Sequence, residues 1–177
     1  MTRFSEFIID KITNSIEDRI SGRSFETEVV AISPEEIKSI HKKDGWLFNW
    51  KKEFKENNDR RIYKLVIKGD RKIQGLLSIE PKPDQQFIEM HLIESAPHNY
   101  GSNKKYFGVA GNLVAFACKT SFDMGFDGIV AFRAKTALMD HYSVTLGAES
   151  VFRERMVIFT PAAKKLVNSY YRNYIDE

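Results

Sequence analysis

The chain has 177 residues, of which 42% are hydrophobic and 12% aromatic, so it can form one well-packed core and is too short for two comfortable ones. Its 27 basic residues are interleaved with 24 acidic ones, and the net charge of +3 makes nucleic acid an unlikely partner. No apolar stretch approaches the length of a membrane span, and the charged N-terminus is unlike a signal peptide. With one cysteine and no disulfide framework, we expect a cytoplasmic protein that contacts no membrane.

The first third of the chain is expected to contain helices around one strand. Apolar residues at three- and four-residue spacing predict an amphipathic N-terminal helix over 1–22, and they are Phe4, Phe7, Ile8, Ile12 and Ile16. Residues 24–32 alternate as in a strand. Ser33 and Pro34 then supply an N-cap and a first helical position, with Glu36 completing a capping box. Gly45 is expected to separate two short helices.

The rest of the chain predicts a meander followed by alternating helices and strands. Three aliphatic stretches separated by tight turns read as antiparallel strands over 61–69, 72–81 and 86–95. Further elements are expected as a helix over 111–122, a strand over 128–134, a helix over 136–148, a strand over 153–160 and a helix over 161–171. Such an order predicts an α+β fold with a mixed sheet and helices on both faces.

Residues 105–113, KYFGVAGNL, place two glycines where an apolar helix begins. Glycine weakens a helix, so glycines at a helix start usually allow something to approach the main chain closely. Free N–H groups and the positive end of the helix dipole favour an anion there, and the absent side chains of Gly108 and Gly111 would admit a pyrophosphate. A turn that feeds a helix also favours glycine, so the pattern alone leaves both explanations open.

The chain resembles the GNAT superfamily of N-acetyltransferases between about residues 24 and 160. The similarity rests on the strand FIEMHLIES, on the motif K-x-x-G-x-A-G-x-L from Lys105 to Leu113, and on Tyr142 followed by Leu-Gly-Ala at 146–148. Lys105 stands where the family usually has glutamine or arginine. Lys135 replaces a frequent asparagine, and the loop before the motif is unusually long.

We expect a single domain over 1–177, in which the helix 1–22 and a C-terminal helix over 161–177 flank a core over 24–160 that resembles an acetyltransferase. Its fold would be a central mixed, mostly antiparallel sheet with helices on both faces. Its cosubstrate would be acetyl-CoA, with the pantetheine arm between two splayed strands and the diphosphate on backbone amides of residues 107–112. A strand bulge would free an amide near Leu92 or Ile93 to polarise the carbonyl. The expected coenzyme contacts are Leu92, Ile93, Lys105, Phe107, Gly108, Val109, Ala110, Gly111 and Asn112.

Two residues are expected to move protons. An alkyl ammonium has a pKa near ~10 and must lose a proton before it attacks, and Glu89 in the FIE stretch matches the general base of histone acetyltransferases in the superfamily. Glu80, His91 and Glu94 are alternatives, with His91 expected on the strand face of Glu89 and Glu94 on the opposite face. Tyr142 matches the family's general acid. The non-catalytic alternatives are that Glu89 is a surface carboxylate and that Tyr142 is an aromatic residue of the core.

Other side chains indicate less. Cys118 lies in an apolar helix and reads as a small core residue. The four histidines show no metal-binding spacing, so we expect no metal. Trp46, Trp50 and Phe54 read as core residues or as a wall of the acceptor pocket.

Two functions therefore remain. One is an acetyl-CoA-dependent N-acetyltransferase that acts on a primary amine of a small molecule or protein by direct attack in a ternary complex. The other is a non-catalytic acyl-CoA-binding sensor or interaction module of the same fold. The acceptor is not indicated, and a homodimer is left open.

Overall fold

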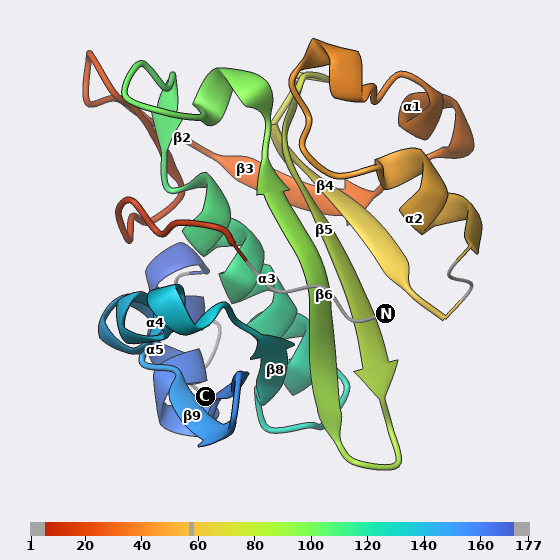
Figure 1. The fold of residues 1–177 in the computed structure, drawn as a ribbon. Helices are drawn as coiled ribbons and strands as arrows, with labels where there is room; N and C mark the ends of the chain where they lie inside the picture. Colours follow the sequence, from red (N-terminus) through yellow and green to blue (C-terminus); the bar gives the residue numbers. More distant parts are fainter. Residues whose placement is uncertain (1–5, 57–58, 172–177) are drawn as a thin grey trace.

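The computed structural model describes residues 6–56 and 59–171, and a seven-stranded sheet in the order β3-β4-β5-β6-β8-β10-β9 forms its centre (Figure 1). Every neighbouring pair is antiparallel except β6 and β8. This confirms the mixed, mostly antiparallel sheet. The strands are β3 (Thr27–Ala31), β4 (Arg61–Ile67), β5 (Ile73–Lys82), β6 (Phe87–Ser95), β8 (Val130–Arg133), β9 (Glu149–Phe152) and β10 (Arg155–Ile158).

Helices cover both faces of this sheet, as expected (Figure 1). On one face lie α1 (Pro34–Lys38) and α2 (Trp50–Glu56), which bury Ile37 and Trp50 against Leu76 and Leu92. The other face carries α3 (Val109–Asp123) and α5 (Thr160–Tyr170), together with α4 (Met139–Leu146) near the end of β8. Short 3₁₀ turns are η1 (Lys42–Asp44), η2 (Pro97–Asn99) and η3 (Thr136–Leu138).

Several local signals acted as predicted. The Ser33 side chain accepts from the Glu36 amide while the Glu36 carboxylate accepts from the Ser33 amide, so the capping box starts α1. Gly45 adopts a φ of 108° and ends η1. The strands β4, β5 and β6 form the predicted antiparallel meander.

The predicted N-terminal helix is wrong over the described part of 1–22, while Phe4 lies outside the described residues. Residues 6–15 contain no helix, and β1 (Ile16–Asp18) then pairs with β2 (Ser24–Phe25) and β7 (Tyr106–Phe107). Burial here has a period of two, because Phe7 and Ile9 are buried whereas Ile8 is 51% exposed. Packing against the body of the protein therefore overrides the helical spacing of the isoleucines.

The final predicted strand, 153–160, corresponds to β10, and β9 before it was not predicted. Arg153 takes a φ of 51° and lies in the turn that joins these two antiparallel strands. Strand β10 then places Arg155 opposite Arg133 of β8.

Candidate functional site

Strands β6 and β8 stay together over only two residue pairs. Ile88 pairs with Val130 and Glu89 with Ala131, after which the two parallel strands separate. The gap opens toward the end of β6, and α3 begins behind this end of the sheet (Figure 1). Ligands of open α/β sheets commonly bind where neighbouring strands diverge at their carboxyl ends.

Strand β6 bulges at His91, beside the start of the gap. Ser78 faces Leu92 and Ile79 faces Met90, so His91 is one extra residue with no partner position on β5. The bulge turns His91 and Leu92 toward the same face. It also reverses the expectation for Glu94, which lies on the face of Leu92 and Glu89, because one inserted residue exchanges the faces of those that follow.

Glu94 holds the loop before α2 against β6. Its carboxylate accepts hydrogen bonds from the amides of Leu47 at 2.6 Å and Phe48 at 3.3 Å, and from Trp50 Nε1 at 2.8 Å. Only 4% of the residue is exposed. A buried carboxylate that accepts three N–H groups serves best as a structural acceptor.

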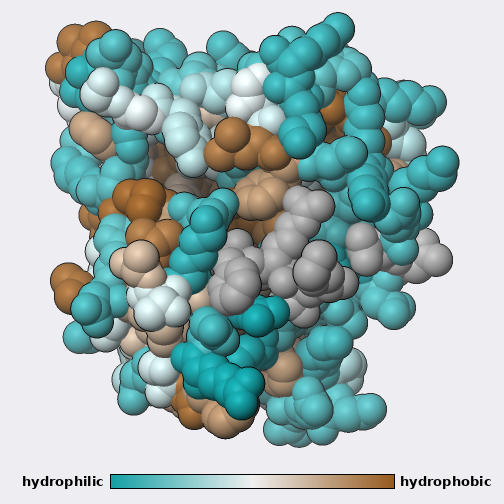
Figure 2. Space-filling view, in the orientation of Figure 1, coloured by the Kyte–Doolittle hydropathy of each residue, from teal (hydrophilic) through white to brown (hydrophobic). Residues whose placement is uncertain are grey.

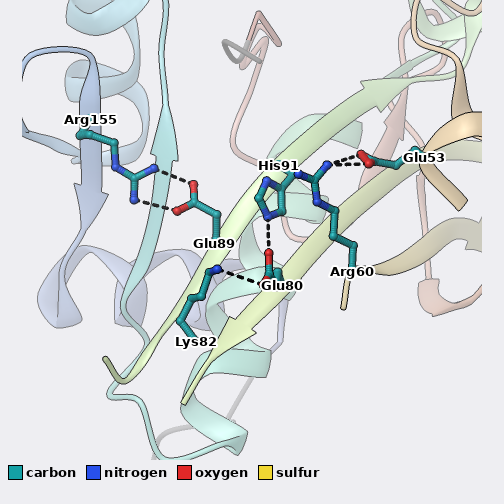
Figure 3. A network of polar contacts seen from close by, with 7 residues as sticks. All are labelled: Glu53, Arg60, Glu80, Lys82, Glu89, His91 and Arg155. Carbon is teal, nitrogen blue, oxygen red and sulfur yellow. Dashed lines mark hydrogen bonds and ion pairs between the residues drawn. The ribbon is translucent and has the colours of Figure 1, made fainter. Parts of the chain in front are cut away.

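Glu89 forms a two-fold contact with Arg155 of β10 (Figure 3). Each carboxylate oxygen lies 2.7 Å from a different guanidinium nitrogen. The hydrogen bond to Glu89 raises the pKa of Arg155, against the opposing effect of burial. Glu89 is thus a buried member of a charge-assisted pair that joins β6 to β10.

His91 faces Glu80 across the strand pair (Figure 3). The distance from His91 Nε2 to Glu80 Oε1 is 2.9 Å, and Lys82 Nζ lies 2.9 Å from the other oxygen. Burial lowers the pKa of His91 from its usual 6.5, although the Glu80 hydrogen bond acts in the opposite direction. Burial raises the pKa of Glu80, but its hydrogen bonds with Lys82 and His91 outweigh this and the net pKa is lowered. A neutral imidazole beside a carboxylate results.

The start of α3 holds an anion that belongs to the chain itself. Gly108, the N-cap, adopts a φ of 89°, and its amide donates to Asp10 Oδ1 at 3.0 Å. Lys104 Nζ lies 2.9 Å from the other Asp10 oxygen, and the two side chains are only 18% and 16% exposed. The expected anion-binding property of this helix start is thus used by a carboxylate.

Both glycines of the motif are needed by neighbouring chain segments. A Cβ on Gly108 would overlap Thr13 Oγ1 and lie 2.8 Å from the carbonyl oxygen of Ser15. On Gly111 it would overlap the Tyr170 hydroxyl and lie 3.2 Å from its ring. That hydroxyl in turn accepts from the Thr13 amide at 3.2 Å. Close approach explains the glycines, and the approaching groups come from residues 13–15 and α5.

Tyr142 is fully buried on α4 and packs against Phe132 of β8, with ring centroids 5.4 Å apart. Its hydroxyl donates to the Phe7 carbonyl at 2.7 Å, and the two rings stack with centroids 4.6 Å apart. Burial raises the pKa of Tyr142 well above its usual 10. The phenol is therefore protonated, as an acid must be before it acts.

The structure brings most of the expected coenzyme contacts to one end of the gap. Val109, Ala110, Gly111 and Asn112 form the buried first turn of α3, and Asn112 Nδ2 donates to Thr27 Oγ1 at 2.8 Å. Phe107 lies on β7 and the Lys105 side chain is exposed. Of the two residues expected near the carbonyl, Leu92 and Ile93 face opposite sides of the sheet, in separate hydrophobic clusters.

A pocket of about 310 Å³ lies beside the gap. Its walls come from the end of β6, the loop at Leu47 and Phe48, the loop 99–104 and the N-terminal segment. Three hydrophobic lining residues are more than half exposed, namely Ile8, Leu47 and Tyr100. Figure 2 shows hydrophobic side chains in a hollow on this face, with hydrophilic ones around it. Carboxylates of Glu6, Asp10 and Glu94 also line the pocket.

The remaining candidates occupy structural places. Cys118 is fully buried, and burial raises the pKa of its thiol. Trp46 and Trp50 are buried under α1 and α2 and Phe54 is 36% exposed, while Leu47 and Phe48 line the pocket. Residues 6–56 and 59–171 contain no cluster of three metal-ligating side chains and no helix fit to cross a membrane. The expectation of no metal stays a prediction.

Sequence reasoning missed the groups that fill the gap and pair the carboxylates. These are Phe7, Asp10, Lys104, Arg155 and Tyr170. One signal was available for the N-terminal segment, because Phe7-Ile8-Ile9 is a run of three apolar residues that one helix face does not explain. Pairing between distant segments left no local signal.

Known structures share this fold. No known family profile matches the sequence, and no curated protein sequence matches it either. A chimeric spermidine N-acetyltransferase from Vibrio cholerae superposes with a TM-score of 0.56 at 15% identity, covering 78% of this chain and 99% of that one. The dodecameric Vibrio cholerae spermidine N-acetyltransferase gives 0.54 at 15% identity, covering 76% and 94%.

A Bacillus subtilis acetyltransferase in complex with CoA gives a TM-score of 0.50 at 12% identity, covering 77% of this chain and 99% of that one. At such identities the likeness establishes the fold. The chain has the fold of these acetyltransferases, and in it β6 and β8 separate after two residue pairs.

Substitution Gly111→Ala tests the close contact with Tyr170. Alanine favours a helix over glycine by about 1 kcal/mol, but overpacking costs about 1–3 kcal/mol, so we expect a lower free energy of unfolding. Urea denaturation would measure it. In a Tyr170→Phe background the same substitution should cost less, because the overlapping oxygen is gone. An equal loss in both backgrounds would exclude this contact as the reason for Gly111.

Proposed function

We propose that the chain is an N-acetyltransferase that uses acetyl-CoA to acetylate a primary amine in a ternary complex. The observation that carries this proposal is the separation of β6 and β8 after two residue pairs, with a glycine-started helix at the open end. The likeness in fold to spermidine N-acetyltransferases and to a CoA-bound acetyltransferase supports it.

The start of α3 suits a coenzyme diphosphate. Gly108 already donates its amide to an anionic oxygen, and Lys104 neutralises the same anion. Exchange of the Asp10 carboxylate for a diphosphate would keep both interactions, since each group offers negatively charged oxygens. Acetyl-CoA would supply the activated acetyl group, as a thioester.

The pocket beside the gap suits a cationic amine. The Glu94 carboxylate in its wall would attract an ammonium group, and Phe48 and Tyr100 offer aromatic surface for its alkyl chain. Several of the similar structures carry the name spermidine N-acetyltransferase, so a polyamine is the first acceptor to test.

His91 is the proton acceptor that the geometry favours. When Nε2–H donates to Glu80, Nδ1 is unprotonated and can accept a proton. The lowered pKa keeps the imidazole neutral at pH 7. Glu89 remains the alternative base, but proton uptake there would have to break the two contacts with Arg155. His91 also projects from the bulge, close to where β6 and β8 begin to separate.

Tyr142 is the proposed acid for the departing thiolate. Its phenol is protonated and buried on the α4 side of the gap. The Tyr142 hydroxyl donates a hydrogen bond to the Phe7 carbonyl, so its proton could reach a thiolate only after this hydrogen bond breaks.

The paired state of Glu89 and Tyr142 also favours the second candidate, a non-catalytic acyl-CoA-binding module. Both residues expected to perform chemistry have structural partners in the molecule. In that case the coenzyme would bind without turnover.

The first test is acetyl transfer itself. With the protein present, millimolar acetyl-CoA and spermidine, spermine or a lysine peptide should release free thiol, and mass spectrometry should show an amine that carries one added acetyl group. A control reaction without amine would measure hydrolysis of acetyl-CoA. Coenzyme binding with no transfer to any amine would favour the binding module, and absence of both would refute the proposed function.

Substitution His91→Gln should lower kcat by ~10²–10⁴, because a positioned general base is removed. In the wild type, the acid limb of the kcat/KM profile should lie below pH 6.5, since burial lowers the pKa of His91 from that value. The limb should disappear in the variant. Glu89→Gln is the matched comparison and should cost mainly stability. A wild-type-like profile in His91→Gln, with Glu89→Gln inactive but folded, would instead assign the base to Glu89.

Substitution Tyr142→Phe should lower kcat by ~10²–10⁴ while coenzyme binding becomes no weaker. The ring and its stacking with Phe7 survive, whereas the proton for the thiolate is lost. Pre-steady-state rates and calorimetric coenzyme affinity would separate the two effects. A kcat within about threefold of wild type in the saturated variant would remove Tyr142 as the acid.

A further inference from the structure

Residues 6–15, hereafter the strap, run along the region in which the proposed coenzyme would lie. In Figure 1 the strap crosses in front of α3 on the side of the gap between β6 and α4. It has no regular secondary structure and is held by contacts from its side chains and backbone. These contacts reach from Tyr142 at one end to the first turn of α3 at the other.

At the Tyr142 end the strap supplies an apolar filling. Phe7 is only 6% exposed and packs between Tyr142, at 4.6 Å between ring centroids, and Phe132 of β8, at 5.9 Å. Its carbonyl accepts from the Tyr142 hydroxyl, the group proposed to act on the thiol. The amide of Ile9 donates to His141 Nε2 at 2.9 Å.

At the α3 end the strap supplies a negative charge. Asp10 takes the Gly108 amide and the Lys104 ammonium, which are the two donors that a diphosphate would need. Three residues further on, the Thr13 amide binds the Tyr170 hydroxyl over Gly111. Along the strap, an apolar group therefore lies beside Tyr142 and an anion lies at the start of α3.

We propose that the strap is an internal occupant of the coenzyme groove, with Phe7 in the place of the pantetheine end and Asp10 in the place of the diphosphate, and that coenzyme binding requires its displacement. This inference rests on the proposed function. While the strap is in place, these contacts block the coenzyme groove, so the strap regulates access to the site. Strand β1 follows directly and stays paired with β7, which gives the strap a fixed attachment when it moves.

The apparent coenzyme affinity then depends on how often the strap is open. An intramolecular competitor lowers the apparent affinity by the open fraction, without any change in the contacts of the bound state. Loss of one charge-assisted hydrogen bond should raise that fraction by about tenfold or more. Variants that weaken either end of the strap should therefore bind coenzyme more tightly.

The experiment uses the full chain and coenzyme A as the probe. Calorimetry should show a dissociation constant for Asp10→Asn about tenfold lower than for the wild type. Asp123→Asn is the matched control, because it removes one negative charge from an ion pair with Lys119 at the end of α3 opposite to Gly108. Its dissociation constant should change less than about twofold.

Phe7→Ala separates displacement from simple charge repulsion. It leaves the net charge unchanged and removes the contact with Tyr142 rather than the one with Gly108, yet it should also tighten coenzyme A binding. If only Asp10→Asn binds coenzyme A more tightly, while folded Phe7→Ala binds it as the wild type does, the cause is repulsion between Asp10 and the diphosphate. This result would overturn the strap proposal.

Hydrogen exchange of the wild type gives an independent readout that holds even if Phe7→Ala fails to fold. Saturating coenzyme A should speed exchange at the amides of Ile9 and Thr13, which lose His141 and Tyr170 as acceptors. The Gly108 amide should stay protected by the new anion. Slower or unchanged exchange at Ile9 and Thr13 would show that residues 6–15 are a wall of the site and would overturn the inference.

The two proposals fail differently. Equal coenzyme A affinity in every variant, with acetyl transfer intact, would overturn the strap and leave the proposed function standing. No binding to the wild type or to folded Asp10→Asn and Phe7→Ala would overturn both.

Discussion

The early separation of β6 and β8 is the constraint on which the rest of the structure depends. Two residue pairs hold these strands, and beyond them neither strand pairs along its inner edge with another strand of residues 6–56 and 59–171. Exposed strand edges and apolar side chains must be covered by another chain segment, a ligand or water. In the described part of the protein, Phe7 covers Phe132 and Tyr142 on the β8 side of the gap. A fold that opens its own sheet in this way needs an occupant for the opening.

On the face of the sheet that carries α1 and α2, carboxylates are paired with cations. Glu89 pairs with Arg155, Glu80 with Lys82, and Glu53 with Arg60 at 2.6 Å (Figure 3). The first of these pairs ties β6 to β10 just beside the last shared residue pair of β6 and β8. It thereby helps to hold β6 in place where it still pairs with β8. His91 is the member of this network whose charge can change near neutral pH, because its ordinary pKa is 6.5 and burial lowers it.

Much of the architecture followed from local sequence, and its failures have physical causes. The capping box at Ser33, the meander of β4 to β6 and the helix after Gly108 depend on short-range patterns, so they were predictable. The N-terminal segment was mispredicted because its isoleucine spacing fits a helix, while its conformation is decided by distant partners such as Tyr142. The bulge at His91 was expected only from the family, and it changed the face of Glu94, which no propensity could reveal.

The glycines of the motif illustrate why a site can be located from sequence while its occupant cannot. The pattern correctly indicated a helix start that an anion approaches closely, and the structure places a carboxylate there. Backbone amides and a helix dipole do not distinguish a carboxylate from a phosphate, since both present charged oxygens. The choice between them is set by concentration. If the strap fills the groove about 99% of the time, the coenzyme's apparent dissociation constant rises about a hundredfold over its intrinsic value. Asp10 lies ninety-eight residues before Gly108 in the sequence, so the occupant of this local motif is decided by a remote segment of the chain.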